Sequence, residues 1–244
     1  MTGEKPKNKE FEKLFSEVQQ LRKRLLTTIA SHKIFDQFNK IVATNVVGKR
    51  KAEKNAKVFS NYVYFFSTTK EATRCYFLIE LAKFFDTPKS RNETRSIYWV
   101  LDYAKKNIHR LTKEDFLVYH DERQIIPEIF ASYKQFEASD LKKFQKRLER
   151  NKDVIKRLKI YRDQYLAHDD IKKITVKLTV REMEILLHIV KDVIKLFYNK
   201  LDFASNSYKN FEEEPVREID RLVKNLAEHE KQRLEEIRQK YAVK

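Results

Sequence analysis

The sequence predicts an all-α protein, and three features of its composition support this fold class. Gly and Pro number only 2 and 4 among 244 residues, against averages of about 7 % and 5 % in proteins generally. Charged residues make up 36 % and hydrophobic residues 41 % of the chain, a mixture that suits long amphipathic helices with short connections. Folds rich in turns or in phosphate-binding glycine loops, such as β-sandwiches, dinucleotide-binding folds, P-loop NTPases and kinases, are therefore poor candidates.

Apolar residues recur at a spacing of three and four along most of the chain, and this pattern defines the expected helices. We expect a disordered lead over residues 1–10, a helical domain over residues 11–205 and an additional C-terminal amphipathic helix over residues 211–244. The expected helices cover about residues 11–25, 34–46, 52–67, 70–86, 96–103, 138–167, 179–204 and 215–241, with one or two short helices within residues 112–137.

Five residues mark expected helix ends. Gly48 is suited to end a helix, because glycine tolerates the left-handed backbone found there. Ser96 is suited to cap the N-terminus of a helix. Thr112 and Thr179 each precede an acidic residue by three positions, which is the spacing of a capping box. Pro215 fits the first turn of the last helix.

Some segments need a separate interpretation. Residues 70–86 are apolar nearly all round, so we expect this helix in the centre of a bundle, with Cys75 as inert packing. Residues 171–178 alternate between polar and apolar side chains, which predicts an extended connector or a short hairpin arm. His188 has apolar neighbours on both sides, so we expect a core histidine rather than a metal ligand.

Cysteine and histidine usage gives no indication of a bound group. One cysteine excludes an internal disulfide and a Cys-based zinc site, and the histidines lack the spacing of zinc ligands. We therefore expect no metal and no other cofactor.

Residues 1–12 lack the apolar segment of a signal peptide, and no run approaches the roughly 18 apolar residues of a membrane span. These features predict a cytoplasmic protein that does not enter the membrane.

The chain is strongly basic. Lys and Arg outnumber Asp and Glu by 52 to 36, for a formal net charge of +16, which favours a polyanionic partner, most often nucleic acid. Residues 1–60 hold 14 basic and 6 acidic residues, and residues 140–180 hold 13 and 6, so these two regions carry nearly all of the excess. They are the candidate RNA-facing surfaces, although solvated helix faces would also account for the charge. Most of the 12 Tyr and 17 Phe lie at core spacing, so we expect packing rather than base stacking. The candidate RNA-binding residues are Lys156, Arg157, Lys159, Lys172 and Lys173.

Arg162 is the most informative residue of the chain. It lies four residues after Leu158 and therefore falls on the apolar stripe of the helix expected there. An arginine in that position needs an anionic partner, for which Asp163, Asp169 or an outside anion are candidates. His168 follows six residues later, so its side chain converges with that of Arg162 only if the helix frays or ends before His168.

Arg, His and a carboxylate on a basic surface suit the cleavage of RNA, which carries its own nucleophile, the 2′-hydroxyl. His168 would transfer a proton near neutral pH, and Arg162 would bind the phosphate and offset its developing charge. This chemistry does not require a metal. Cleavage involves two proton transfers, so a two-fold homodimer with facing motifs would supply both imidazoles. The simpler alternative is a salt bridge of Arg162 with Asp163 or Asp169 beside a surface His168.

The segment resembles the signature of the HEPN superfamily, in which Arg is followed by four to six residues and then His. Asp163 matches the polar residue that typically follows the Arg. The ending Tyr165-Leu166-Ala167-His168-Asp169 is similar to that of AbiU-like abortive-infection members. The upstream segment from Leu78 to Asp86 resembles their helix that ends in Phe-Asp. The resemblance covers about residues 10–205.

The resemblance implies a HEPN-type helical bundle, commonly dimeric, that acts as a metal-independent endoribonuclease in phage defence or as a toxin. By motif matching, Arg162 and His168 would be catalytic and Asp163 would orient them. RNA would be the substrate, and an antitoxin or another defence protein would be a partner. Asp170 stands where members silenced by a nucleotidyltransferase antitoxin often carry Tyr, so silencing by tyrosine adenylylation is not expected. Because many members have lost activity, the alternative is a non-catalytic RNA-binding or regulatory HEPN module in a defence complex.

Overall fold

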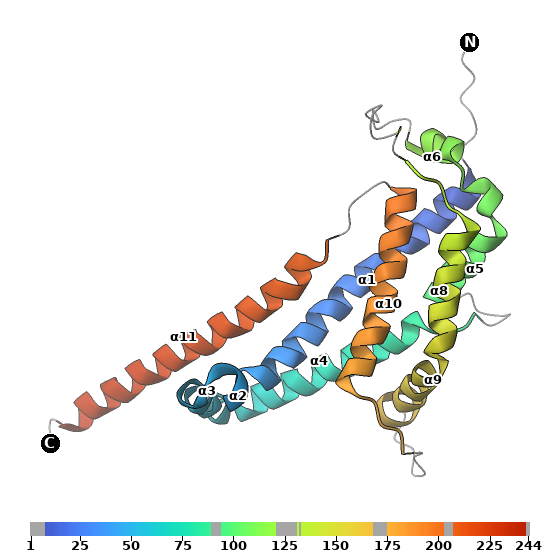
Figure 1. The fold of residues 1–244 in the computed structure, drawn as a ribbon. Helices are drawn as coiled ribbons and strands as arrows, with labels where there is room; N and C mark the ends of the chain where they lie inside the picture. Colours follow the sequence, from blue (N-terminus) through green and yellow to red (C-terminus); the bar gives the residue numbers. More distant parts are fainter. Residues whose placement is uncertain are drawn as a thin grey trace. The chain divides into compact units, whose positions relative to one another are not determined.

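A computed structural model describes residues 8–88, 94–120, 131, 133–167, 175–202 and 207–242. Every regular element among these residues is helical, so the all-α fold class is confirmed. The elements, labelled where there is room in Figure 1, are α1 (Lys9–Lys40), α2 (Thr44–Val47), α3 (Lys49–Asn61), α4 (Val63–Phe84), α5 (Ile97–Lys106), the 3₁₀ turn η1 (Ile108–Arg110), α6 (Lys113–His120), α8 (Ala138–Arg150), α9 (Lys152–Tyr161), the π-helix η3 (Arg162–Ala167), α10 (Val180–Leu201) and α11 (Lys209–Ala242).

The contacts within the chain group its residues into two compact units. Unit 1 contains residues 1–25 and 78–207, and unit 2 contains residues 26–77 and 208–244. The limits fall inside α1 and α4, so each of these helices contributes residues to both units. The division into domains expected from the sequence stays a prediction.

Unit 1 has a core of aliphatic and aromatic side chains from several helices. α8 packs against both α5 and α10. α1 meets α10 through Phe15 and Tyr198, whose ring centroids are 6.1 Å apart. α1 meets α4 where the guanidinium of Arg24 lies 4.8 Å from the ring centroid of Phe84. Side chains buried in this unit include Phe11, Leu14, Phe15, Leu21, Leu25, Leu81, Phe84, Phe85, Leu158, Val190, Val193 and Phe197.

Three expected helix caps are confirmed. Ser96 Oγ accepts a hydrogen bond from the backbone N–H of Trp99 at 3.2 Å, ahead of α5. The hydroxyl of Thr112 accepts from the N–H of Asp115 at 3.1 Å, and the Asp115 carboxylate accepts from the N–H of Thr112 at 3.2 Å. Thr179 forms the same reciprocal pair with the third residue of α10. Side chains thus satisfy N–H groups that have no partner inside their own helix.

Unit 2 has a separate core of aliphatic and aromatic side chains between α3, α11 and the unit 2 parts of α1 and α4. α11 packs against α3. Two side-chain hydrogen bonds also join α11 to α1 and to the residue between α3 and α4. Gln37 Nε2 donates to Asp220 at 2.7 Å, and the Tyr62 hydroxyl donates to Glu230 at 3.0 Å. The buried residues of this core are Phe38, Ile41, Val58, Phe66, Ile219 and Val223.

Helix boundaries in the N-terminal third differ from those expected. The helices expected over residues 11–25 and 34–46 form one helix as far as Lys40, because the residues between them include neither Gly nor Pro and bury Thr28 and His32. Gly48 has φ of +81° and ends α2, as expected. The junction of α3 and α4 lies at Tyr62 rather than near residue 68.

Three expectations further along the chain were wrong. The helix expected over residues 138–167 is interrupted at Asn151, which separates α8 from α9. The last helix begins at Lys209 and holds Pro215 in its interior, where the ring nitrogen has no hydrogen to donate. His188 is exposed, because it points away from the face of α10 that Leu186 and Val190 share.

The Ser96 cap makes a testable contribution to stability. Ser96→Ala removes a buried hydroxyl that satisfies the N–H of Trp99, so we expect a loss of about 1 kcal/mol in the free energy of unfolding. Ser60→Ala is the matched control, since Ser60 is an exposed serine whose hydroxyl only donates to the Ala56 carbonyl within α3. Chemical denaturation followed by circular dichroism compares the two variants. Equal losses would contradict the assigned role of Ser96.

Candidate active site

Arg162 begins η3, a 6-residue π-helix that continues α9 as far as Ala167. π-helical turns are rare and occur mostly at functional sites. The rings of Tyr161 and Tyr165 stack across the junction with their centroids 5.0 Å apart. The α-helical hydrogen-bond pattern thus stops where the Arg…His motif begins. His168 itself lies outside the described residues.

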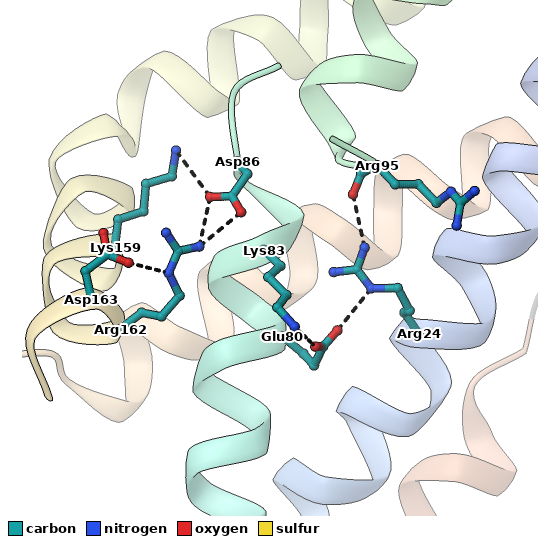
Figure 2. Close-up of polar contacts among 8 residues, drawn as sticks. All are labelled: Arg24, Glu80, Lys83, Asp86, Arg95, Lys159, Arg162 and Asp163. Atoms are coloured by element: carbon teal, nitrogen blue, oxygen red, sulfur yellow. Dashed lines mark hydrogen bonds and ion pairs between the residues drawn. The ribbon is translucent and has the colours of Figure 1, made fainter. Parts of the chain in front are cut away.

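Two carboxylates hold the Arg162 side chain (Figure 2). Nε donates to Asp163 at 2.7 Å, and Nη1 lies 2.9 and 3.0 Å from the two carboxylate oxygens of Asp86. The Arg162 side chain is only 18 % exposed. Burial by itself would lower the pKa of Arg162, but the hydrogen bonds with Asp163 and Asp86 outweigh it and raise the pKa. Arg162 is therefore a permanent cation in a fixed orientation.

Asp86 owes its position to the buried end of α4. Phe84 and Phe85 are both fully buried, and the helix ends at Phe84. These two anchored rings place Asp86 just beyond the helix end, where Figure 2 shows its carboxylate facing the guanidinium of Arg162. Asp86 was not predicted from the sequence as a partner of Arg162. The available signal was its place after two apolar aromatic residues in the segment that resembles the HEPN family.

Lys159 is a second cation beside the same carboxylate. Its Nζ lies 4.0 Å from Asp86, and both side chains are about one-quarter exposed. Burial is the main cause of a lowered Lys159 pKa; the neighbouring Arg162 lowers it further, while Asp86 and Asp163 oppose the shift. Two cations and two carboxylates thus form a neutral cluster, in which Lys159 is the less strongly held cation.

The described partners of Arg162 do not use all of the N–H groups of its guanidinium. A guanidinium carries five N–H groups, two of them on Nη2. Within the described part of the chain, hydrogen bonds use Nε and Nη1 but not Nη2. The arrangement can therefore orient the guanidinium through one edge and offer Nη2 to an outside oxyanion.

One comparison with known protein families gives a match over most of the chain. Residues 9–223 match the model of the AbiU2 family of HEPN domains. The chain belongs to this family, whose members are domains of abortive infection systems. No curated protein and no solved structure matches the chain. The matched region contains the cluster around Arg162 and extends into α11.

A second ionic cluster stabilises the end of α4 in this HEPN domain (Figure 2). Glu80 accepts hydrogen bonds from Arg24 at 3.0 Å and from Lys83 at 2.7 Å, and Arg24 also donates to the carbonyl of Arg95 at 3.0 Å. Burial would raise the pKa of Glu80, but the hydrogen bonds from Lys83 and Arg24 lower it overall. The cluster ties α4 to α1 and to the segment before α5, less than two turns from Asp86.

The predicted RNA-binding residues have different surroundings in the HEPN domain. Lys156 is exposed, and no ion pair involves it among the described residues. Arg157 donates to Glu182 and to the carbonyl of Lys177, so it joins α9 to the start of α10. Lys159 belongs to the cluster around Asp86. Lys172 and Lys173 lie outside the described residues.

The described residues show neither a metal site nor a membrane-spanning helix. Among the residues that the structure describes, no group of three or more His, Cys, Asp or Glu side chains has the arrangement of a metal site. No helix in the described ranges has the length and apolar character needed to cross a bilayer.

The ion pair of Arg162 with Asp86 gives a measurable coupling. In a double-mutant cycle of Arg162→Ala and Asp86→Ala, we expect a coupling energy of about 1 kcal/mol or more, because Nη1 contacts both carboxylate oxygens and the pair is mostly buried. The same cycle on Lys106 and Asp102, an exposed pair one turn apart in α5, should give less than about 0.5 kcal/mol. Denaturant unfolding of the wild type, the four single variants and the two double variants measures both values. A coupling near zero for the first pair would contradict the geometry.

Acid should weaken the junction of α9 and α10. The hydrogen bond from Arg157, followed by that from the Thr179 backbone, lowers the pKa of Glu182 from 4.5 to about 2. A lowered native pKa stabilises the fold above pH 4.5, and this contribution disappears as the pH falls toward 2. Glu182→Gln lacks the contribution, so its free energy of unfolding should fall less than that of the wild type across this window. Denaturation of both proteins at pH 5, 3 and 2 measures these free energies. An equal loss of stability in the wild type and in Glu182→Gln would contradict the role of Glu182.

Proposed function

We propose that this HEPN domain is a metal-independent endoribonuclease that cleaves RNA by attack of the 2′-hydroxyl. The observation that carries the proposal is the Arg162 guanidinium, which is mostly buried, is fixed by Asp86 and Asp163, and makes no hydrogen bond through Nη2 to any residue that the structure describes. It begins the Arg…His motif of a family that acts in abortive infection. The excess positive charge of the chain suits a polyanionic substrate.

The proposed reaction needs only a base, an acid and a cation. The 2′-oxygen forms a bond to the adjacent phosphorus as a base removes its proton. The bond from phosphorus to the 5′-oxygen breaks, and an acid protonates that oxygen. The products are a 2′,3′-cyclic phosphate and a free 5′-hydroxyl. Arg162 would bind a non-bridging oxygen and offset the charge that grows as phosphorus becomes five-coordinate.

His168 is proposed as the group that transfers protons, because imidazole exchanges a proton near neutral pH. Asp163, which holds Nε of Arg162, is proposed to orient the motif. One motif supplies one imidazole for two proton transfers. A two-fold homodimer with facing motifs would supply the second. Lys156, Lys172 and Lys173 would contact flanking phosphates.

In the cell, we propose that the nuclease acts in the cytoplasm during phage infection or as a toxin, and that an antitoxin or another defence protein restrains it. The alternative is a domain that binds RNA or regulates a defence complex without cleaving RNA. One observation favours this alternative. Asp86 and Asp163 already neutralise Arg162 and Lys159, so a phosphate must compete with carboxylates for the guanidinium. A phosphate could begin this competition at Nη2, which makes no hydrogen bond to the residues that the structure describes.

Activity measurements on purified protein test the proposal. His168→Ala should lower the rate of RNA cleavage by about 10²–10⁴-fold, the usual contribution of an acid–base group. Arg162→Lys should restore only part of the activity lost in Arg162→Ala, because an ammonium does not offer a planar, bidentate edge. His188→Ala is the matched control, since His188 is exposed on α10 and should leave the rate unchanged.

Two further outcomes decide between the readings. Cleavage in EDTA at the rate seen with magnesium supports the proposed mechanism, whereas dependence on magnesium would contradict it. If the wild type binds RNA but leaves it intact, and His168→Ala binds equally well, the non-catalytic alternative replaces the nuclease.

A further inference from the structure

One face of α3 packs against the core of unit 2, and the opposite face is exposed to solvent. Its inward face consists of Ala52, Asn55 and Val58, all buried. Asn55 Nδ2 donates to the carbonyl of Ile41 at 2.7 Å, and α11 packs against the helix. These contacts fix the rotation of α3 about its axis, so its outward face is determined as well.

The outward face carries a row of cations. Arg50, Lys54 and Lys57 follow one another at the i, i+4, i+7 spacing of a single helical stripe. All three are exposed, and so are Lys49 and Lys51 in the first turn.

The cations of α3 differ from those of α11 in their ion pairs with described residues. Within the described part of the chain, none of the five basic residues of α3 forms an ion pair. Glu53 is exposed on the same helix and offsets one charge. The exposed cations of α11 behave differently: Lys224 pairs with Glu228 at 3.9 Å, and Lys231 pairs with Glu235 at 3.8 Å. The positive charge of α3 is therefore available to an external anion.

Two exposed aromatic rings follow this row in the sequence, at the start of the next helix. Tyr64 and Phe65, in the first turn of α4, are 86 % and 54 % exposed, and only Tyr62 separates α4 from α3. Phe65 packs edge-on against Phe66, with ring centroids 5.2 Å apart, and Phe66 in turn stacks on Phe59 at 4.1 Å. The Phe65 ring is thus backed by the aromatic core of unit 2 and held at the surface.

We infer that the cations of α3 and the rings of Tyr64 and Phe65 form a binding surface for single-stranded RNA. Cations that follow the phosphates and rings that stack on unpaired bases are the two components of such surfaces. An amphipathic membrane helix would instead insert its apolar face into lipid, but the apolar face of α3 is already covered. The inference rests on the proposed function for the identity of the partner, and it concerns unit 2 alone.

Binding of a labelled single-stranded 2′-O-methyl oligonucleotide, measured by fluorescence anisotropy, tests this surface independently of catalysis. The 2′-O-methyl group blocks the proposed nucleophile, so loss of cleavage and loss of binding are separate results. The triple variant Arg50→Glu, Lys54→Glu and Lys57→Glu should raise Kd about tenfold or more. It should also lower the slope of log Kd against log salt by about 2, from roughly 0.7 for each lost phosphate contact.

The matched control reverses three exposed charges on α11, in the variant Lys224→Glu, Lys231→Glu and Arg238→Glu. It has the same net charge as the α3 variant, so it separates local contacts from the overall field of the protein. A Kd within about twofold of wild type supports the inference. Equal weakening by both variants would overturn it, and so would binding of the wild type to phosphatidylglycerol vesicles without binding to the oligonucleotide.

Stacking is tested with the aromatic residues. Tyr64→Ala should raise Kd roughly tenfold, in keeping with the loss of one stacked base, whereas Tyr64→Phe should bind like the wild type because the ring remains. Tyr241→Ala is the control, since Tyr241 is 68 % exposed near the end of α11. Unchanged binding by Tyr64→Ala, or an equal loss in Tyr241→Ala, would show that the ring makes no contact with RNA.

Discussion

The arrangement of the candidate site depends on the ion pair between Arg162 and Asp86. It joins two segments that are 76 residues apart in the sequence. A guanidinium on the apolar stripe of α9 is costly to bury unless a carboxylate meets it. The two buried phenylalanine rings before Asp86 hold that carboxylate in place. The pair therefore allows a cation to be mostly buried at the end of α9 in a fixed orientation, while Nη2 makes no hydrogen bond to the described residues.

The same geometry also opposes the binding of a phosphate. Asp86 and Asp163 orient Arg162 but also neutralise it, and Lys159 shares the Asp86 carboxylate. A phosphate that enters the site would redistribute these pairs rather than meet an isolated charge. Such a cluster is suited to bind a group whose negative charge grows during the reaction, because a stronger anion competes better for the guanidinium.

Much of the fold follows from local sequence signals, and part of the site does not. Ser96, Thr112 and Thr179 were recognisable as caps because each cap depends on residues within three positions of one another. The continuous helix through Thr28 was not recognised, since apolar spacing alone does not tell a short polar interval from a break. Of the two partners of Arg162, Asp163 was predicted, because it is the next residue in the sequence. Asp86 was missed, because it is 76 residues away and only the packing of α4 brings it near.

The central claim is that Arg162 and His168 act on a phosphodiester whose own 2′-hydroxyl is the nucleophile. An RNA oligonucleotide with a single 2′-deoxynucleotide at the mapped cleavage position tests this most directly. The account predicts that cleavage at that position disappears while the remaining positions are cut as before. Continued cleavage at the 2′-deoxynucleotide would contradict it, because the nucleophile would then have to come from water or from the protein.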